Sequence, residues 1–211
     1  VTQSSRKALF SVSNLTAFKD MTFESFNQRG HVGLSNEQTT SLTYAFNQAR
    51  RFAQELSGWL LFTGTYGCGK THLAAAIANT AVSSATPTLF LTAPDLLDWM
   101  RFSYDSPDAT FEQRFEEIRN IDLLVLDDLG TQNATPWAQE KLFQIINHRY
   151  VNRLATVLTT NQDLEEIEGR IRSRLQDPTL VGVIKISAPD TVPPRWTAPT
   201  RCSPRCTCSA T

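Results

Sequence analysis

The sequence lacks any apolar run that approaches the roughly 20 residues needed to span a membrane, which argues against an integral membrane protein. Residues 1–7 are polar and do not form the apolar core of a secretory signal peptide. An excess of one charge is also lacking. The 20 Lys and Arg residues nearly balance the 21 Asp and Glu residues, so the net charge of −1 creates no global field toward nucleic acids or membranes. We therefore expect a soluble cytoplasmic protein in which any DNA contact depends on a local patch.

Cysteine and histidine are scarce, with four and three residues respectively. Three of the cysteines (Cys202, Cys206 and Cys208) lie within the last ten residues, and because no histidine is near them they favour incidental thiols over a zinc site. Five prolines interrupt residues 189–211, which are rich in Thr, Ser and Arg and show no hydrophobic period. Such a segment buries too little surface to order itself, so we expect a disordered tail there.

The strongest local signal is the stretch GTYGCGKT at residues 64–71, which matches the phosphate-binding pattern G-x-x-x-x-G-K-[ST] at every fixed position. A short apolar run, 59–63, precedes it and a run of strong helix formers follows it. Glycines let backbone N–H groups converge on an anion, and the following helix adds its positive dipole end. We expect this loop to bind the phosphates of ATP, through the residues Gly64, Thr65, Tyr66, Gly67, Cys68, Gly69, Lys70, Thr71 and His72.

Two acids follow a second apolar run, LLVL at 123–126. The carboxyl ends of parallel strands meet at one edge of the sheet, so Asp127 is expected beside the phosphate loop, where it would hold Mg²⁺ together with Thr71. Asp128 would orient or polarise the attacking water. The alternative is an ordinary solvated turn, in which Asp is common.

Polar groups near two later segments complete the predicted site. Asn161 follows the apolar run 155–160, where its amide could bond the attacking water or the γ-phosphate, unless it only stabilises a turn. Three arginines alternate in GRIRSRL at 169–175. Either they form a basic helix face that solvent covers, or one of them reaches the nucleotide of a neighbouring subunit. An arginine in the second role raises the rate of hydrolysis by about 10³–10⁵.

Apolar periodicity predicts strands alternating with helices, and therefore a three-layer α/β fold with a five-stranded, mainly parallel sheet flanked by helices. We expect a lead-in at 1–35, with mobility at 1–21, and an ATP-binding core at 36–188. The predicted strands are 59–63, 88–92, 121–127, 155–160 and 180–187. The predicted helices are 36–56, which Gly58 ends, and 70–83, 94–102, 108–119, 136–152 and 168–175.

Taken together, residues 64–74, 123–130, 159–161 and 169–175 resemble the corresponding motifs of AAA+ ATPases, and among these the DnaC/DnaI helicase loaders; the chain is also similar to the IstB-type transposition helper ATPases. The blocks WAQEKLF at 137–143 and NHRY at 147–150 add to the resemblance, which covers about residues 20–188. It implies slow ATP hydrolysis in a homo-oligomer that forms with ATP, and action on a replicative helicase and single-stranded DNA.

The resemblance also implies residue roles. Arg174 matches the arginine finger, with Arg170 as second choice, and Asn161 matches the first sensor. The helices between the second and third strands would face DNA, with Arg101, Tyr104 and Arg114 as candidate contacts, although the aromatic residues of this region could instead belong to the core.

Two features depart from the loader pattern: about 35 residues precede the first long helix, and no lid with a second sensor arginine is recognisable. Three other functions stay open: a transposition helper ATPase, a P-loop phosphotransferase and a non-enzymatic adaptor that ATP switches.

Overall fold

The computed structural model describes residues 13–28, 34–104, 110–130 and 135–188, except for the side chains of residues 101–104, 110 and 111. It contains a sheet of five strands in the order β2-β3-β4-β1-β5, and each pair of neighbouring strands is parallel. The strands are β1 (Trp59–Gly64), β2 (Thr88–Thr92), β3 (Leu123–Asp127), β4 (Thr156–Thr160) and β5 (Val181–Ile186). The predicted α/β class and five-stranded parallel sheet are confirmed, and the strand ends differ from prediction by one or two residues.

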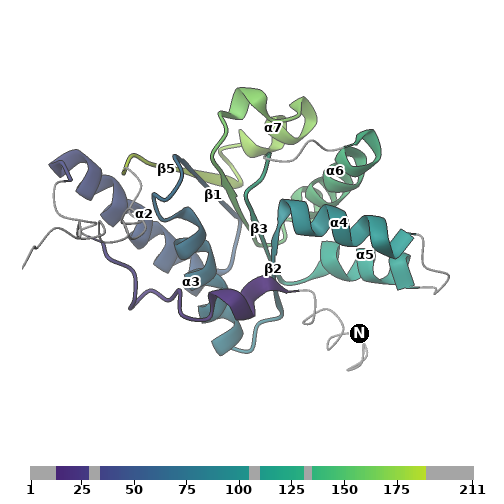
Figure 1. Cartoon of the computed structure of the whole chain (residues 1–211), viewed down its shortest axis with the longest axis horizontal. Helices are drawn as coiled ribbons and strands as arrows, with labels where there is room; N and C mark the ends of the chain where they lie inside the picture. Colours follow the sequence, from purple (N-terminus) through teal and green to yellow (C-terminus); the bar gives the residue numbers. More distant parts are fainter. Residues whose placement is uncertain (1–12, 29–33, 105–109, 131–134, 189–211) are drawn as a thin grey trace, which may run out of the picture.

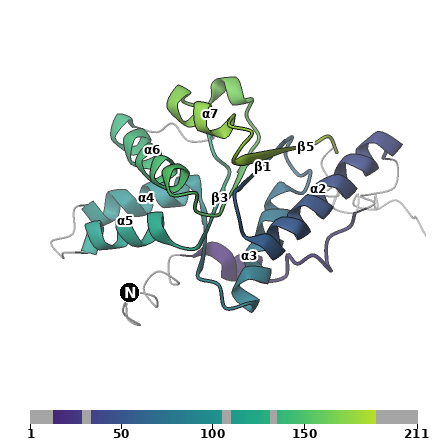
Figure 2. The ribbon, with the colours of Figure 1, turned by 180° about the vertical axis from the view of Figure 1, so that it is seen from behind.

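Helices cover both faces of the sheet, as Figure 1 and the reverse view in Figure 2 show. One face carries α2 (Asn36–Glu55) and α3 (Lys70–Ser83). The other carries α4 (Ala93–Tyr104), α5 (Thr110–Asn120), α6 (Pro136–Val151) and α7 (Gly169–Leu175). Two short 3₁₀ helices, η1 (Asn14–Phe18) and η2 (Leu164–Glu166), complete the described elements.

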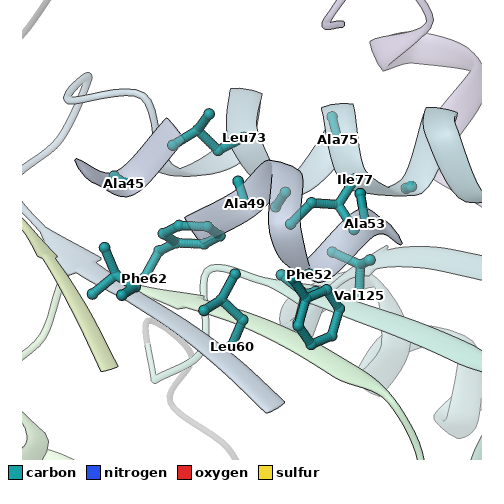
Figure 3. Packing of buried hydrophobic residues seen from close by; sticks show 14 of the residues in the cluster. Ala45, Ala49, Phe52, Ala53, Leu60, Phe62, Leu73, Ala75, Ile77 and Val125 are labelled. Atoms are coloured by element: carbon teal, nitrogen blue, oxygen red, sulfur yellow. The ribbon is translucent and has the colours of Figure 1, made fainter. Parts of the chain in front are cut away.

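The two faces have separate cores because successive strand residues point to opposite sides of the sheet. Leu61 of β1 packs with the α4–α7 layer, whereas its neighbours Leu60 and Phe62 pack under α2 and α3. In Figure 3 small residues of α2, among them Ala45 and Ala49, lie against α3 above these strand side chains. Alanines let the two helices pack closely over this face of the sheet.

Helix ends follow their local signals. Ser35 caps α2 in a reciprocal capping box with Gln38. Thr135 caps α6, and Pro136 occupies its first position. The helix α2 ends at Glu55, one residue before the predicted end, and its left-handed C-cap is Leu56 (φ 44°), whereas the sequence suggested Gly58 as the residue that terminates it.

At each edge of the sheet a serine hydroxyl bonds backbone groups of the edge strand or of the residue that follows it. Ser13 Oγ accepts from Phe90 N–H (3.3 Å) and donates to Phe90 O (3.4 Å) on β2. Ser41 Oγ of α2 donates to Lys185 O (3.0 Å) and accepts from Ser187 N–H (3.1 Å) beside β5. These contacts occupy backbone groups through which an exposed edge strand could pair with another chain.

The described part of the predicted lead-in packs against the core, whereas we expected mobility through residue 21. Phe18 contacts the Phe90 ring at 5.0 Å, and Asn79 Nδ2 of α3 donates to the carbonyl oxygens of Phe18 and Met21, both at 3.0 Å. These few apolar side chains find partners on α3 and β2 that a window of local sequence does not reveal.

Candidate nucleotide-binding site

The phosphate loop joins the carboxyl end of β1 to the first turn of α3. Gly64 adopts φ +147°, and a methyl group at this position would lie 2.4 Å from Ile186 O. Gly69 adopts φ +101°, and a methyl group there would meet the Phe26 ring at 3.0 Å. Only glycine fits this curled backbone. The first turn of α3 also has no side-chain cap, so its N–H groups remain available to an anion.

Lys70 points into the loop that precedes it. Its Nζ donates to Gly64 O at 2.9 Å and to Thr65 O at 2.6 Å, and its side chain is almost fully buried. An ammonium group has three donors and no acceptor, so these carbonyls hold the charge inside the curl of the loop. This is the place that the sequence motif predicted.

Asp127 lies at the end of β3, opposite the start of α3. The Thr71 hydroxyl donates to its carboxylate, 3.0 Å from both oxygens, and the Thr159 hydroxyl of β4 donates to Oδ1 at 2.6 Å. Burial raises the pKa of Asp127 and the charge of Asp128 adds to this, while the two hydroxyl donors and Lys70 oppose it. The predicted pair of Mg²⁺ ligands, Thr71 and Asp127, is therefore assembled.

Asp128 is fixed by contacts with the end of β4. Its φ of +62° is a left-handed conformation, which Asp tolerates better than most residues. Its backbone N–H donates to Thr159 Oγ1 at 2.9 Å, and Leu129 N–H donates to Thr159 O at 2.8 Å. These two hydrogen bonds attach the turn after β3 to β4. Asp128 begins this turn, directly after the buried Asp127.

Asn161 carries the most informative observation in the site. Both of its amide atoms, Oδ1 and Nδ2, are buried, and neither has a hydrogen-bond partner among the described residues. It follows Thr160, which lies opposite Thr63 in the sheet, so Asn161 lies level with the start of the phosphate loop. A buried amide without partners costs about 1–3 kcal/mol per group, which a polar ligand would remove.

The other side chains in the loop and just after it mostly contact protein groups. The Thr65 hydroxyl donates to Ala188 O (3.3 Å), and Cys68 is fully buried, which raises the pKa of its thiol. His72 Nε2 lies 2.9 Å from Thr22 O and 3.2 Å from Ser25 Oγ, on the lead-in. The Thr65 and His72 side chains thus bond segments outside the loop, whereas Cys68 Sγ lies inside it, 3.8 Å from Lys70 Nζ. At these positions we expect the backbone to meet phosphate. Tyr66 is 71% exposed.

The two candidate finger arginines lie on α7 and face α6. Arg170 pairs with Glu168 (2.7 Å) and Glu140 (3.0 Å). Arg174 donates from Nε and Nη2 to Asn147 Oδ1 at 2.9 and 2.6 Å. Among the described contacts, neither arginine bonds a residue of the phosphate loop of its own chain. This geometry is compatible with an arginine that reaches the nucleotide of a neighbouring molecule.

The predicted DNA contacts lie mainly outside the described side chains. Arg101 and Tyr104 belong to α4, but their side chains are not described. Arg114 on α5 is half-buried. Nearby, Phe115 belongs to the core, and Arg119 lies over its ring and pairs with Glu116. Trp99 of α4 is partly buried and packs against the same core, which favours the core interpretation for this aromatic residue.

Sequence reasoning missed two residues with structural roles. Thr159, in the site, joins Asp127 to the turn at Asp128, and its position two residues before Asn161 could have indicated this. Arg149 of α6 lies away from the site, at the amino end of β4; it is fully buried and bonds four groups, including Thr156 Oγ1 at 2.9 Å and Ala155 O at 2.6 Å. The apolar residues expected on the buried face of this helix behave as follows: Leu142, Ile145 and Ile146 are buried, while Trp137 and Tyr150 are partly buried.

The donor set suits a magnesium-bound triphosphate. The described residues include no group of three or more His, Cys, Asp or Glu side chains that could hold a metal alone. The hydroxyl and carboxylate oxygens of Thr71 and Asp127 match the preference of Mg²⁺ for one or two protein ligands plus phosphate oxygens. Within the described ranges, each helix is too short or too polar to cross a membrane.

The strand order, the phosphate loop after β1, the acids after β3 and the polar residue after β4 define a P-loop protein of the AAA+ class. The chain belongs to the family described as IstB-like ATP binding protein, which its sequence matches over residues 3–185. Two curated relatives from Escherichia coli strain K12 are similar to it. The replicative helicase loader DnaC is 30% identical over 141 residues, covering 65% of this chain and 58% of DnaC, and the uncharacterized protein YdaV is 32% identical over 143 residues, covering 66% and 57%. The chain thus spans less than two thirds of their length.

Solved structures have the same fold. A crystal structure of the DnaC helicase loader matches with a TM-score of 0.66 and 23% identity, over 81% of this chain and 99% of that one. A crystal structure of DnaI matches with a TM-score of 0.62 and 22% identity, over 83% of this chain and 92% of that one. The structure of the replication initiator DnaA bound to AMPPCP and single-stranded DNA matches with a TM-score of 0.64 and 22% identity, over 78% of this chain and 50% of that one. The resemblance inferred from the sequence motifs is confirmed.

Proposed function

We propose that this chain binds ATP with Mg²⁺ and hydrolyses it, and that residues 36–188 form the ATP-binding core. The unpartnered amide of Asn161 carries the proposal, because a buried polar group at the convergence of the loop and the acids is best explained by a polar ligand. The glycine conformations and the inward Lys70 support the same ligand.

Each residue has a role that its position supports. Lys70 exchanges its loop carbonyls for phosphate oxygens, while Thr71 and Asp127 hold the metal. The bound Mg²⁺ would neutralise charge on the phosphates. Asp128 orients and polarises the attacking water, and Asn161 donates its amide N–H to phosphate or water. Arg174, or as second choice Arg170, completes the site of a neighbouring subunit in an ATP-dependent homo-oligomer.

We further propose that this ATPase loads a replicative helicase onto single-stranded DNA in the cytoplasm. The relatives named replicative helicase loader support the client, and the DnaA structure with single-stranded DNA supports the nucleic acid. Transposition is the second candidate, favoured by the IstB-like family match. A phosphotransferase is less favoured because paired acids and the Arg170–Arg174 cluster suit hydrolysis. A nucleotide-gated adaptor would show tight binding with very low turnover.

Calorimetry with ATP, ADP and a non-hydrolysable analogue tests the first step. The wild-type chain should release heat with each, and Lys70→Ala should not. Arg174→Ala should bind normally and hydrolyse more slowly under conditions where subunits assemble. If well-folded wild-type protein shows no binding heat, the proposed function is wrong.

Capture of partners from source-cell extract, with and without ATP, tests the client. A replicative helicase retained on the chain supports the loader, and a transposase supports the second candidate. Arg101→Ala combined with Tyr104→Ala should weaken binding to single-stranded DNA at low salt, because a cation and a stacking surface are lost. Unchanged affinity would exclude these residues from the DNA contact.

A further inference from the structure

We propose that Asn147 and Phe143 of α6 are positioning residues, which aim Arg174 while leaving its charge unneutralised for the phosphate of a neighbouring subunit. This inference rests on the proposed ATPase function. It also selects Arg174 over Arg170 as the finger.

Arg174 is oriented only by neutral groups. Its Nε and Nη2 both donate to the amide oxygen Oδ1 of Asn147, and its Nη1 donates to Arg170 O at 2.6 Å. The guanidinium carbon lies 4.8 Å from the centre of the Phe143 ring and 5.6 Å from that of Tyr150. Asp177, beyond Tyr150, accepts hydrogen bonds from Tyr150 and Thr179. In the described part of the chain, no ion pair involves Arg174.

Arg170 lies beside it in the opposite electrostatic setting. It pairs with the carboxylates of Glu168 and Glu140, and it lies 4.1 Å from the Phe143 ring centre. These contacts raise its pKa, first through the Glu168 hydrogen bond. The two carboxylates already neutralise the charge of Arg170, which weakens its attraction for a phosphate, so Arg170 is better suited to bracing α7 against α6.

The geometry of Arg174 leaves donors for an incoming anion. A guanidinium has five N–H donors, and each terminal nitrogen carries two of them. The three bonds to Asn147 and Arg170 use one hydrogen on each nitrogen. One hydrogen on each terminal nitrogen therefore has no partner among the described residues. N–H groups of the terminal nitrogens are among the donors with which arginine binds phosphate.

The test replaces the amide of Asn147 with an isosteric carboxylate. Asn147→Asp keeps the acceptor, so a merely structural contact should survive and the thermal midpoint should not fall. If Asn147 serves to leave the charge free, the new ion pair should lower kcat by about ten- to a hundred-fold with unchanged ATP affinity. Asn47→Asp is the control, because Asn47 is exposed in the middle of α2, on the other face of the sheet. It makes the same charge change without touching α7.

Mixed assemblies identify the subunit in which Asn147 acts. Lys70→Ala chains cannot hold ATP but carry Arg174, whereas Arg174→Ala chains hold ATP but lack the arginine, so a mixture should recover part of the hydrolysis. Adding Asn147→Asp to the Lys70→Ala chain should abolish that recovery, and adding it to the Arg174→Ala chain should not. Sedimentation velocity with a non-hydrolysable ATP analogue and single-stranded DNA should also show weaker assembly of Asn147→Asp.

The outcomes separate this inference from the function beneath it. If the wild-type chain hydrolyses ATP and Asn147→Asp keeps the same kcat and assembles normally, the positioning role alone is overturned. The same conclusion follows if Asn147→Asp abolishes the recovered hydrolysis when it is added to either chain of the mixture. A wild-type chain that binds no nucleotide would refute the proposed function and the inference with it.

Discussion

Replacing Arg149 with methionine should remove a large part of the stability of this fold. The side chain is fully buried between α6, the end of α5 and the start of β4. Its Nη1 donates to the carbonyl oxygens of Arg119 (3.1 Å) and Ile121 (2.8 Å), while Nε and Nη2 bond the strand residues that begin β4. Burial lowers the pKa of Arg149 to about 9, and the charge of Asp122 opposes this, so the guanidinium remains charged at neutral pH.

Methionine fills much of the same volume but donates no hydrogen bonds. Ala155 O would keep its bond from Leu124 N–H, so the main loss falls on the oxygens of Arg119 and Ile121. Each buried acceptor without a partner costs about 1–3 kcal/mol. Two of them cost about 2–6 kcal/mol, and we expect a loss near 4 kcal/mol, against a total stability of about 5–15 kcal/mol for a typical protein.

For a chain of this size a loss of 1 kcal/mol lowers the melting temperature by about 2–4 °C, so Arg149→Met should lower it by about 8–16 °C. Urea denaturation followed by circular dichroism measures the free energy directly. Arg51→Met is the matched control, because Arg51 is exposed and makes only a 3.9 Å pair with Glu55, worth under about 1 kcal/mol. If the two variants differ by less than about 1 kcal/mol, the interpretation of Arg149 as a structural tie is refuted.

Three further predictions concern the site and the pH response. Gly64→Ala should abolish ATP binding in calorimetry, because the new methyl would lie 2.4 Å from Ile186 O, whereas Gly169→Ala, with open space around it, should bind normally. Thr159→Val removes the 2.6 Å hydrogen bond to Asp127, and should weaken ATP binding about tenfold when Mg²⁺ is present; equal affinity would exclude this hydroxyl from the site. Burial, assisted by Arg119, lowers the pKa of His148 below 6.5, so the neutral ring contributes stability that is present above pH 6.5 and is lost as pH falls through the lowered pKa. His148→Gln should flatten the fall in melting temperature between about pH 7 and 5, and an unchanged slope would show that another group causes it.

Much of the fold could be predicted because its signals are local. The strands β1–β4, which are largely buried, appear as short apolar runs, and the helices as a period near 3.6 residues. The phosphate loop is a single contiguous motif. The rule that ligands bind at the carboxyl ends of parallel strands placed Asp127 near Thr71, and the structure has them in contact.

The environment of each polar side chain could not be predicted in this way. His72 directly follows the phosphate motif, yet its ring contacts Thr22, 50 residues earlier. Arg149 bonds the carbonyl oxygen of Ile121, just after α5 and 28 residues earlier, and local sequence gives no sign that this arginine is buried.

The sequence by itself determined the alternation of strands and helices, the backbone of the phosphate loop and the acids beside it, because these depend on residues adjacent in the chain. Only the tertiary structure decided that the buried Asn161 amide has no partner among the described residues, that Arg149 is buried and that Arg174 contacts neutral groups where Arg170 pairs with carboxylates. The charge and dielectric around a side chain are set by whichever distant segments pack against it, and packing is a property of the whole folded chain.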